Sequence, residues 1–187
     1  MLPIYVVNNY GQFNHLIHRA LRDLEIEAAM IPNTMPPEQV GEECRGIILG
    51  GGPAIERAGN CPQYLDLGLP VLGICLGLHI IAMKFGGNVH QGHSGGYGPV
   101  EVEICEPDNI LNGYPSKINV WASHADEVSQ IPSPFTCLAR SDICNAEAIA
   151  WPEKRIYGLQ WHPEVSHTFE GQRVFENFNR IILENPV

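Results

Sequence analysis

Two five-residue segments place a nucleophilic side chain between glycines, a pattern typical of a tight turn from a strand into a helix. They are Gly73-Ile-Cys75-Leu-Gly77 and Gly92-His-Ser94-Gly-Gly96. The first follows an apolar, strand-like run and precedes a helical pattern. The second follows Asn88-Val-His-Gln, which does not have the pattern of a strand, and its trailing glycines cannot start a helix. Cys75 is therefore the candidate nucleophile, and Ser94 is expected to lie in a glycine-rich loop.

The position of Cys75 suits a reactive thiol. It would stand at the N-terminus of a helix over 76–85, where backbone N–H groups and the helix dipole favour a thiolate. The N–H of Leu76 would point to the place where an oxyanion could form during attack on a carbonyl. We therefore predict nucleophilic chemistry at this turn.

A cysteine nucleophile needs a base, and the base needs a group that orients it. His162 follows a predicted strand directly, so it would project from the carboxyl end of a parallel sheet, where ligands usually bind. Glu164 lies two residues further on, close enough to reach the outer ring nitrogen if the chain turns. The alternative is that both are loop residues or half of a metal site, although the remaining histidines are too scattered to complete one.

A third candidate element is the glycine turn Gly50-Gly51-Gly52-Pro53, which follows a predicted strand. Its functional interpretation is a second oxyanion donor, the N–H of Gly52. Its alternative interpretation is an ordinary glycine turn before proline. It is not a phosphate-binding loop, because no Gly-Lys-Ser/Thr follows.

The spacing of apolar residues along the sequence predicts the strands and helices that position these residues. Strands and helices alternate in the first half, as in a parallel sheet covered on both faces, and short strands dominate the second half before a last helix. We predict one α/β domain spanning residues 1–187. The predicted strands are 4–7, 28–31, 46–49, 70–74, 100–104, 118–121, 135–139, 146–150 and 156–160, and the predicted helices are 13–24, 76–85 and 170–183.

Composition limits the classes of function. Eleven basic and twenty-one acidic residues give a net charge of −10, which disfavours binding to a nucleic-acid backbone. No apolar run approaches the length of a membrane span, and no basic leader is visible, so we expect a cytoplasmic protein with no membrane partner. The six cysteines form no CxxC pair, which predicts reduced thiols, mostly buried, and no metal site.

The glycine-proline turn, the Gly-Ile-Cys-Leu-Gly turn and the His-Pro-Glu segment, in this order, resemble those of class I (triad-type) glutamine amidotransferases. The resemblance covers essentially the whole chain. It implies a flavodoxin-like, mostly parallel α/β sheet with a small added antiparallel portion. It also implies that Cys75 attacks the side-chain amide of glutamine, forms a thioester and releases ammonia, after which water activated by His162 releases glutamate.

Finer motifs resemble the glutaminase part of GMP synthetase: Ser123-His124-Ala125-Asp126, and the His167-Thr pair that follows His-Pro-Glu-Val. Because the chain ends after one domain, it looks like the separate glutaminase subunit of the two-subunit archaeal enzyme. The resemblance then implies a partner ATP-pyrophosphatase subunit that uses ATP and Mg²⁺ to convert XMP to GMP, with no cofactor in this chain. It places residues 123–126 on the glutamine-binding or partner-coupling side; the alternative is a solvated loop.

One residue departs from the family pattern. The usual Cys-x-Gly-x-Gln glutamine, which helps to hold the substrate, is replaced by His79. His79 lies on the same helical face as Cys75, so we count it among the candidate glutamine contacts. Two alternatives stay open: a glutaminase subunit for anthranilate or carbamoyl-phosphate synthesis, and a catalytically silent regulatory subunit of the same fold.

Overall fold

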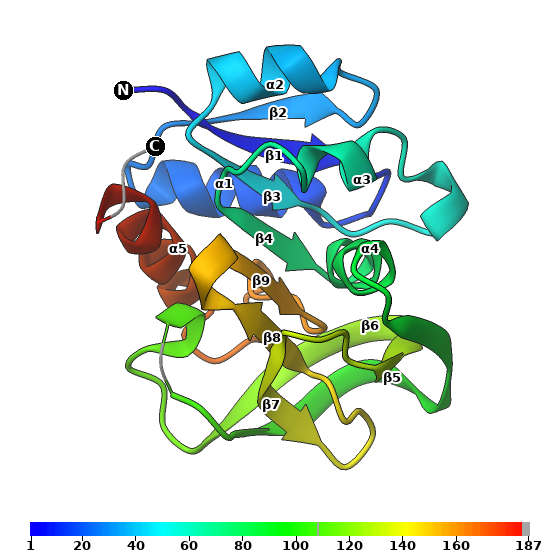
Figure 1. Ribbon diagram of the computed structural model, residues 1–187. Coiled ribbons are helices and arrows are strands. Elements are labelled where there is room, and N and C mark those ends of the chain that lie inside the picture. Colours follow the sequence, from blue (N-terminus) through cyan, green and yellow to red (C-terminus); the bar gives the residue numbers. More distant parts are fainter. Residues whose placement is uncertain (108, 185–187) are drawn as a thin grey trace.

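The computed structural model describes residues 1–107 and 109–184, apart from the side chains of 93–95 (Figure 1). Within these residues, nine strands form one sheet: β1 (Ile4–Asn8), β2 (Ala28–Pro32), β3 (Gly46–Leu49), β4 (Val71–Ile74), β5 (Asn88–Ile104), β6 (Lys117–Gln130), β7 (Thr136–Ser141), β8 (Ala148–Trp151) and β9 (Ile156–Leu159). The helices are α1 (Asn14–Asp23), α2 (Pro37–Glu43), α3 (Cys61–Tyr64), α4 (Leu76–Lys84) and α5 (Gln172–Glu184), with single 3₁₀ turns at Ile55–Arg57, Asn109–Leu111 and Pro152–Lys154.

The sheet has the order β2-β1-β3-β4-β9-β8-β7-β5-β6. The first five strands in this order are parallel, and the pairs from β9 to β6 are antiparallel. The expected antiparallel portion is thus a continuation of the parallel sheet. β9 comes late in the sequence yet lies beside β4, and this pairing brings together the two strand ends that carry Cys75 and His162.

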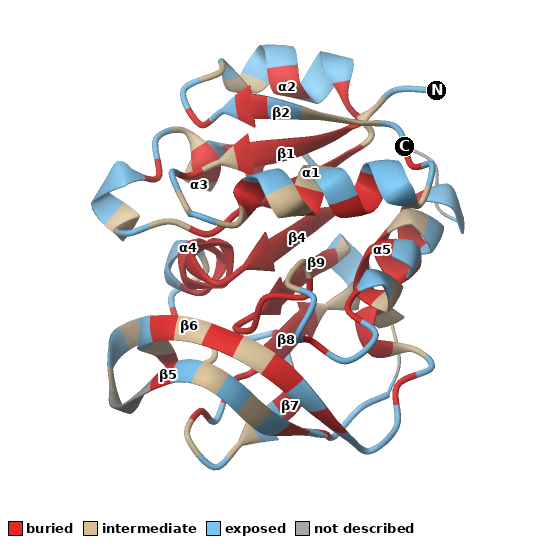
Figure 2. Cartoon of the chain, turned by 180° about the vertical axis from the view of Figure 1, so that it is seen from behind, coloured by how far each residue is buried: buried red, intermediate tan, exposed pale blue. Residues whose placement is uncertain are grey.

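Within the parallel half, β1, β3, β4 and β9 are buried on both faces, as their continuous apolar runs predict, whereas the edge strand β2 is partly exposed (Figure 2). Ile4 and Val6 of β1 pack into the core that contains α1 and α5, whereas Tyr5 and Val7 pack into the core that contains α2, α3 and α4. This alternation follows from the two-residue period of a strand. The two helical layers hold the carboxyl ends of the parallel strands rigidly in place.

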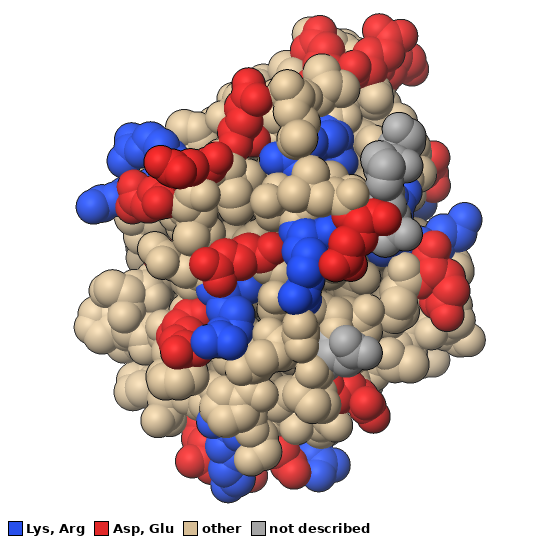
Figure 3. All heavy atoms as spheres, turned by 90° about the vertical axis from the view of Figure 1, so that its left-hand side faces the viewer, with Lys and Arg blue, Asp and Glu red and all other residues tan. Residues whose placement is uncertain are grey.

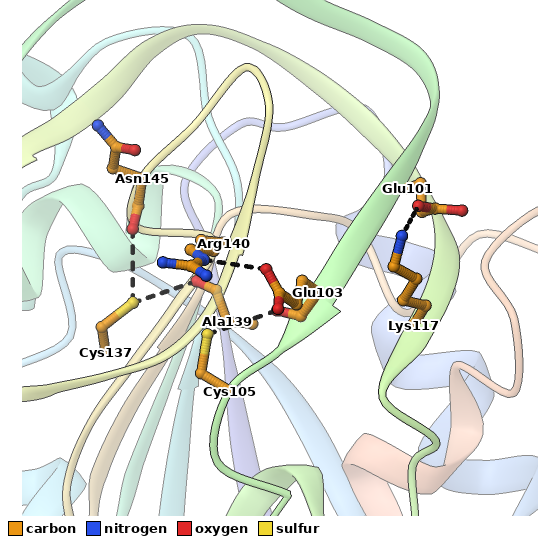
Figure 4. A network of polar contacts seen from close by, with 8 residues as sticks. All are labelled: Glu101, Glu103, Cys105, Lys117, Cys137, Ala139, Arg140 and Asn145. Atoms are coloured by element: carbon orange, nitrogen blue, oxygen red, sulfur yellow. Dashed lines mark hydrogen bonds and ion pairs between the residues drawn. The ribbon is translucent and has the colours of Figure 1, made fainter.

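The antiparallel half is dominated by the long β5–β6 ribbon, which curves past the carboxyl end of β4 near α4 (Figure 1). Cross-strand ion pairs lie at its other end: Lys117 Nζ of β6 lies 2.7 Å from Glu101 of β5, and Arg140 Nε of β7 lies 3.0 Å from Glu103 of β5 (Figure 4). Both pairs are exposed, so each contributes little net free energy. On the face seen in Figure 3, acidic and basic side chains are interspersed.

All nine predicted strands and three predicted helices are present, and most ends are shifted by at most a few residues, but β5 begins 12 residues earlier and β6 ends nine residues later than predicted. Two local predictions are wrong. The run from Asn88 to Gln91 belongs to β5, pairing with β6. Residues 123–126 lie in β6, which removes the alternative of a solvated loop. The physical reason is that this part of the ribbon faces solvent and the pocket, so its strands lack an apolar alternation. The predicted loop at Ser94 also falls within β5, although its side chain lies outside the described residues.

No helix among the described residues has both the length and the apolar character needed to cross a bilayer.

Candidate active site

Cys75 occupies a strained turn between β4 and α4. Its backbone has φ +55° and ψ −106°, a conformation that side-chain-bearing residues rarely adopt. The turn is held because the Cys75 N–H donates to the Leu159 carbonyl at 2.8 Å, extending the β4–β9 pairing by one residue. The approach of α4 to β3 requires glycine at position 77, since a Cβ there would overlap the Leu49 carbonyl. The turn therefore presents the sulfur at the edge of the sheet, as predicted.

His162 and Glu164 follow β9 and face the cysteine. The His162 Nδ1–H donates to Glu164 Oε1 at 2.7 Å, and both side chains are almost wholly buried. Burial lowers the pKa of His162, but hydrogen bonds to Cys75 and Glu164 outweigh it and raise the pKa to about 10. The imidazole is thus held between a sulfur and a carboxylate in its protonated form. The structure brings the three predicted residues together.

The backbone of His162 is also fixed. Its N–H donates to the Trp121 carbonyl of β6 at 3.0 Å, and its carbonyl accepts from the Thr168 hydroxyl at 2.6 Å. The Phe13 ring meets the imidazole edge-on, with ring centroids 5.1 Å apart. These contacts leave the ring little freedom to turn away from Cys75.

The predicted oxyanion donors lie beside the nucleophile. Leu76 is the first residue of α4, so its N–H has no partner within the helix. In the glycine turn, a Cβ built at Gly51 would lie 3.4 Å from His162 Cε1 and 3.9 Å from Cys75 Cβ. Gly52 packs against the Leu76 side chain, and its N–H has no hydrogen-bond partner among the described residues. Both predicted donors thus belong to residues that line the same pocket as Cys75.

A cavity of about 750 Å³ opens over Cys75. Its wall includes His162, the glycine turn, His79 and all four residues 123–126. Cys75 Sγ lies 3.7 Å from the Ser123 carbonyl. The His124 Nδ1–H donates to the Asp126 carbonyl at 2.9 Å, and burial lowers the pKa of His124 to about 4, so this ring is neutral. The sequence-predicted glutamine contacts are thus gathered around one pocket.

His79 has a neighbour that the sequence analysis missed. Its Nε2 lies 2.8 Å from Gln160 Oε1, and Gln160 Nε2 donates to Cys75 Sγ at 3.8 Å. Because Gln160 Oε1 can only accept a hydrogen bond, Nε2 of His79 carries a proton, and burial lowers the pKa of this ring. Gln160 could have been found from strand periodicity, because it lies two residues before His162 and so on the same face.

Four of the five remaining cysteines lie in surroundings that disfavour a thiolate, and the fifth, Cys105, is exposed and lies outside the pocket. Cys44, Cys61 and Cys144 are buried, and burial raises their pKa values to about 11, 12 and 12 respectively. Burial also raises the pKa of Cys137, whose sulfur lies near the carbonyls of Ala139 and Asn145 (Figure 4). These four thiols are poor nucleophiles. In the described part of the chain, no group of three or more His, Cys, Asp or Glu side chains could hold a metal ion.

Comparison with known proteins agrees with this geometry. Residues 5–181 match the family described as glutamine amidotransferase class-I. The chain belongs to this family. It is 72% identical over 184 residues to a glutamine-hydrolyzing GMP synthase subunit from Methanoregula boonei, a match covering 98% of this chain and all of that protein. The subunit of the same name from Methanoculleus marisnigri is 62% identical, with the same coverage.

Solved structures of glutamine amidotransferases share the fold. A crystal structure of a Thermoplasma acidophilum protein, provisionally named as the same kind of GMP synthase subunit, is 36% identical and has a TM-score of 0.93, covering 98% of this chain and 95% of that one. A glutamine amidotransferase from Thermotoga maritima is 18% identical with a TM-score of 0.76, covering 98% and 83%, which shows likeness of fold alone. The predicted flavodoxin-like α/β class is confirmed.

The hydrogen bond from Gln160 to the Cys75 sulfur can be tested by substitution. Gln160→Met keeps the length of the side chain but removes the donor to Cys75 Sγ and the acceptor for His79. We expect kcat for glutamine hydrolysis to fall about tenfold or more, because a hydrogen bond to a charged group contributes about 1.5–3 kcal/mol. Steady-state kinetics of glutamate release would measure this, with KM little changed. An unchanged kcat would mean that the amide does not act on the sulfur.

Proposed function

We propose that the whole chain, residues 1–187, acts as one glutaminase domain that hydrolyses glutamine to glutamate and ammonia. The observation that carries the proposal is the buried alignment of the Cys75 sulfur, the His162 ring and the Glu164 carboxylate around one pocket. A thiolate paired with an imidazolium is a strong nucleophile at neutral pH. The proposal needs no metal or cofactor bound to this chain.

In the first half of the reaction, the Cys75 sulfur attacks the carboxamide carbon of glutamine. The N–H groups of Gly52 and Leu76 stabilise the oxyanion that develops on the carbonyl oxygen. His162 gives its proton to the departing nitrogen as the C–N bond breaks, so ammonia leaves and a thioester remains.

In the second half, neutral His162 takes a proton from water, and the resulting hydroxide attacks the thioester. The C–S bond breaks, glutamate leaves, and the thiolate–imidazolium pair is restored. Glu164 holds the imidazole in one orientation throughout and stabilises its charged form. We assign the pocket residues His79, Ser123, His124, Ala125 and Asp126 to the binding of glutamine or to coupling with the partner.

We further propose that the ammonia passes to a separate ATP-pyrophosphatase subunit, which uses ATP and Mg²⁺ to convert XMP to GMP in the cytoplasm. The names of the relatives, each a subunit of a glutamine-hydrolyzing GMP synthase, support this choice over anthranilate or carbamoyl-phosphate synthesis. The pocket mouth also favours a protein partner. Three exposed large side chains, Tyr10, Met83 and Tyr97, line it, and clustered exposed apolar groups mark interaction sites.

Glutamate release by the purified chain tests the proposal. The chain is assayed alone and then with the candidate partner subunit, ATP, Mg²⁺ and XMP. We expect the partner mixture to raise the rate at least tenfold, and omission of XMP or use of Cys75→Ala to remove the gain. Hydrolysis without stimulation by this partner would keep the chemistry and assign the chain to another amidotransferase. No hydrolysis in any mixture would indicate the silent regulatory subunit.

A further inference from the structure

The carbonyl of Gly51 is held by a buried side chain that the mechanism above does not use. Asn14, the first residue of α1, is 2% exposed, and its Nδ2 donates to the Gly51 carbonyl at 3.0 Å. The second proton of the same amide goes to Asn8 Oδ1 at 3.1 Å, which ties Asn14 to the end of β1. Both donors of the Asn14 amide are therefore occupied, and its orientation is fixed.

The segment between β1 and α1 also holds the backbone of the glycine turn next to the Gly51 carbonyl. Asn9, which is fully buried, donates from Nδ2 to the Gly50 carbonyl at 3.0 Å. Gly11 packs so closely on the Gly51 carbonyl that a Cβ at position 11 would overlap it. Two consecutive carbonyls of a triple-glycine turn are thus bound on one side by this connection.

Holding the Gly51 carbonyl fixes the direction of the Gly52 N–H. The Gly51–Gly52 peptide is trans, so its C=O and N–H point in opposite directions. Gly51 faces the Cys75–His162 pair and Gly52 packs on Leu76, so this peptide lies against the nucleophile. Because Asn14 holds the oxygen, the N–H of Gly52 points away from Asn14 within the pocket wall that both residues share with Cys75.

We propose that Asn14 is a positioning residue that keeps the Gly52 N–H directed at the oxyanion. This inference rests on the proposed nucleophilic role of Cys75. Glycines have no Cβ to restrict rotation of a peptide plane, so the turn alone would not hold one orientation. Rotation would put the Gly51 oxygen where the N–H belongs, and that oxygen would repel the developing negative charge.

Two reactions of Cys75 separate this role from a general effect on the thiol. Acylation by p-nitrophenyl acetate passes through a tetrahedral oxyanion, whereas alkylation by iodoacetamide at its CH₂ carbon does not. For Asn14→Leu, of similar size but without a donor, we expect the acylation rate to fall about 10²–10³-fold, the effect of losing one oxyanion donor. The alkylation rate should stay within about twofold of the wild-type rate, because the Cys75–His162 pair is untouched.

Asn177 provides the matched control. It is also a buried asparagine whose Nδ2 donates to two carbonyls, those of Ile110 and Asn112, but it lies on α5, away from the pocket. Asn177→Leu should lower the melting temperature by an amount similar to Asn14→Leu and leave both Cys75 reactions unchanged. If Asn14→Leu does not fold, Asn14→Ala serves as the second variant with the same expectation.

The outcomes are distinct. Equal losses of acylation and alkylation in the Asn14 variant, or no loss of acylation, would overturn the positioning role. Neither reaction needs glutamine recognition or the partner, so a wild-type chain that acylates at Cys75 but releases no glutamate would contradict the proposed function and still test Asn14. A selective loss of acylation supports the inference.

Discussion

Cys75→Ala is expected to lower glutamine turnover by about 10⁴-fold or more, because removal of a nucleophile that acts together with its base disables the whole unit. The variant should fold normally, since the lost sulfur makes only long contacts with Ser123 and Gln160 and its hydrogen bond to His162 is not needed to hold that ring, which Glu164 also binds. Glutamate release at saturating glutamine, with circular dichroism as the check on folding, measures the result. Substantial residual turnover in the purified variant would remove Cys75 from the nucleophilic role.

Cys75→Gly is the matched control for the backbone. The φ of +55° at this position is strained for any residue with a Cβ, by about 1–3 kcal/mol, and glycine relieves it. The gain is partly offset by the extra entropy of glycine in the unfolded chain, about 0.5–1 kcal/mol. We therefore expect Cys75→Gly to be as inactive as Cys75→Ala and to melt at a higher temperature.

His162→Ala is expected to lower kcat by about 10²–10⁴-fold, the usual contribution of proton transfer by a positioned side chain. Glu164→Gln should lower kcat less, because the glutamine side chain can still accept from His162 Nδ1 and orient the ring. Parallel measurements of kcat for both variants provide the comparison. Equal turnover in the wild type and both variants would refute these roles.

The pH dependence adds a second readout. The hydrogen bonds to Cys75 and Glu164 raise the pKa of His162 from 6.5 to about 10, so the imidazolium survives well above neutral pH. We expect activity to fall on the alkaline side near pH 10, and this limb to move to lower pH in Glu164→Gln. For stability, a raised pKa favours the folded state below pH 6.5, and that contribution is lost as the pH rises toward 10. Denaturant titrations at pH 6 and 9.5 would show it.

The parts of the site that are encoded locally could be predicted from the sequence. The turn at Cys75 could be predicted because glycines flank the nucleophile, and a strand and a helix flank those glycines. His162 and Glu164 lie two positions apart, so a single turn of the chain suffices to join them. Local patterns of this kind do not depend on where the rest of the chain goes.

The parts that depend on distant pairing could not be predicted. Nothing in the sequence around Asn14 indicates a role beyond that of a polar residue at the start of a helix. Only the β1–β3 pairing brings it to the glycine turn. Periodicity places Gln160 on the same face as His162, but its contact with Cys75 depends on the distant β4–β9 pairing. The β5–β6 ribbon escaped prediction near Asn88 because only Val89 and its partner Val128 pack on the core there, and polar residues surround both in the sequence.

The place of β9 in the sheet also has a consequence for the order in which the protein is made. A ribosome delivers β1 to β4 and the Cys75 turn first, and the base arrives about 87 residues later, when His162 emerges. Until then the neighbour of β4 is missing, and a buried four-residue apolar strand stands as an open sheet edge, which invites pairing with other chains. The nascent chain thus has a Cys75 thiol without its base and a β4 edge without its neighbour. Insertion of β9 covers the edge of β4 and brings His162 to Cys75 in one step.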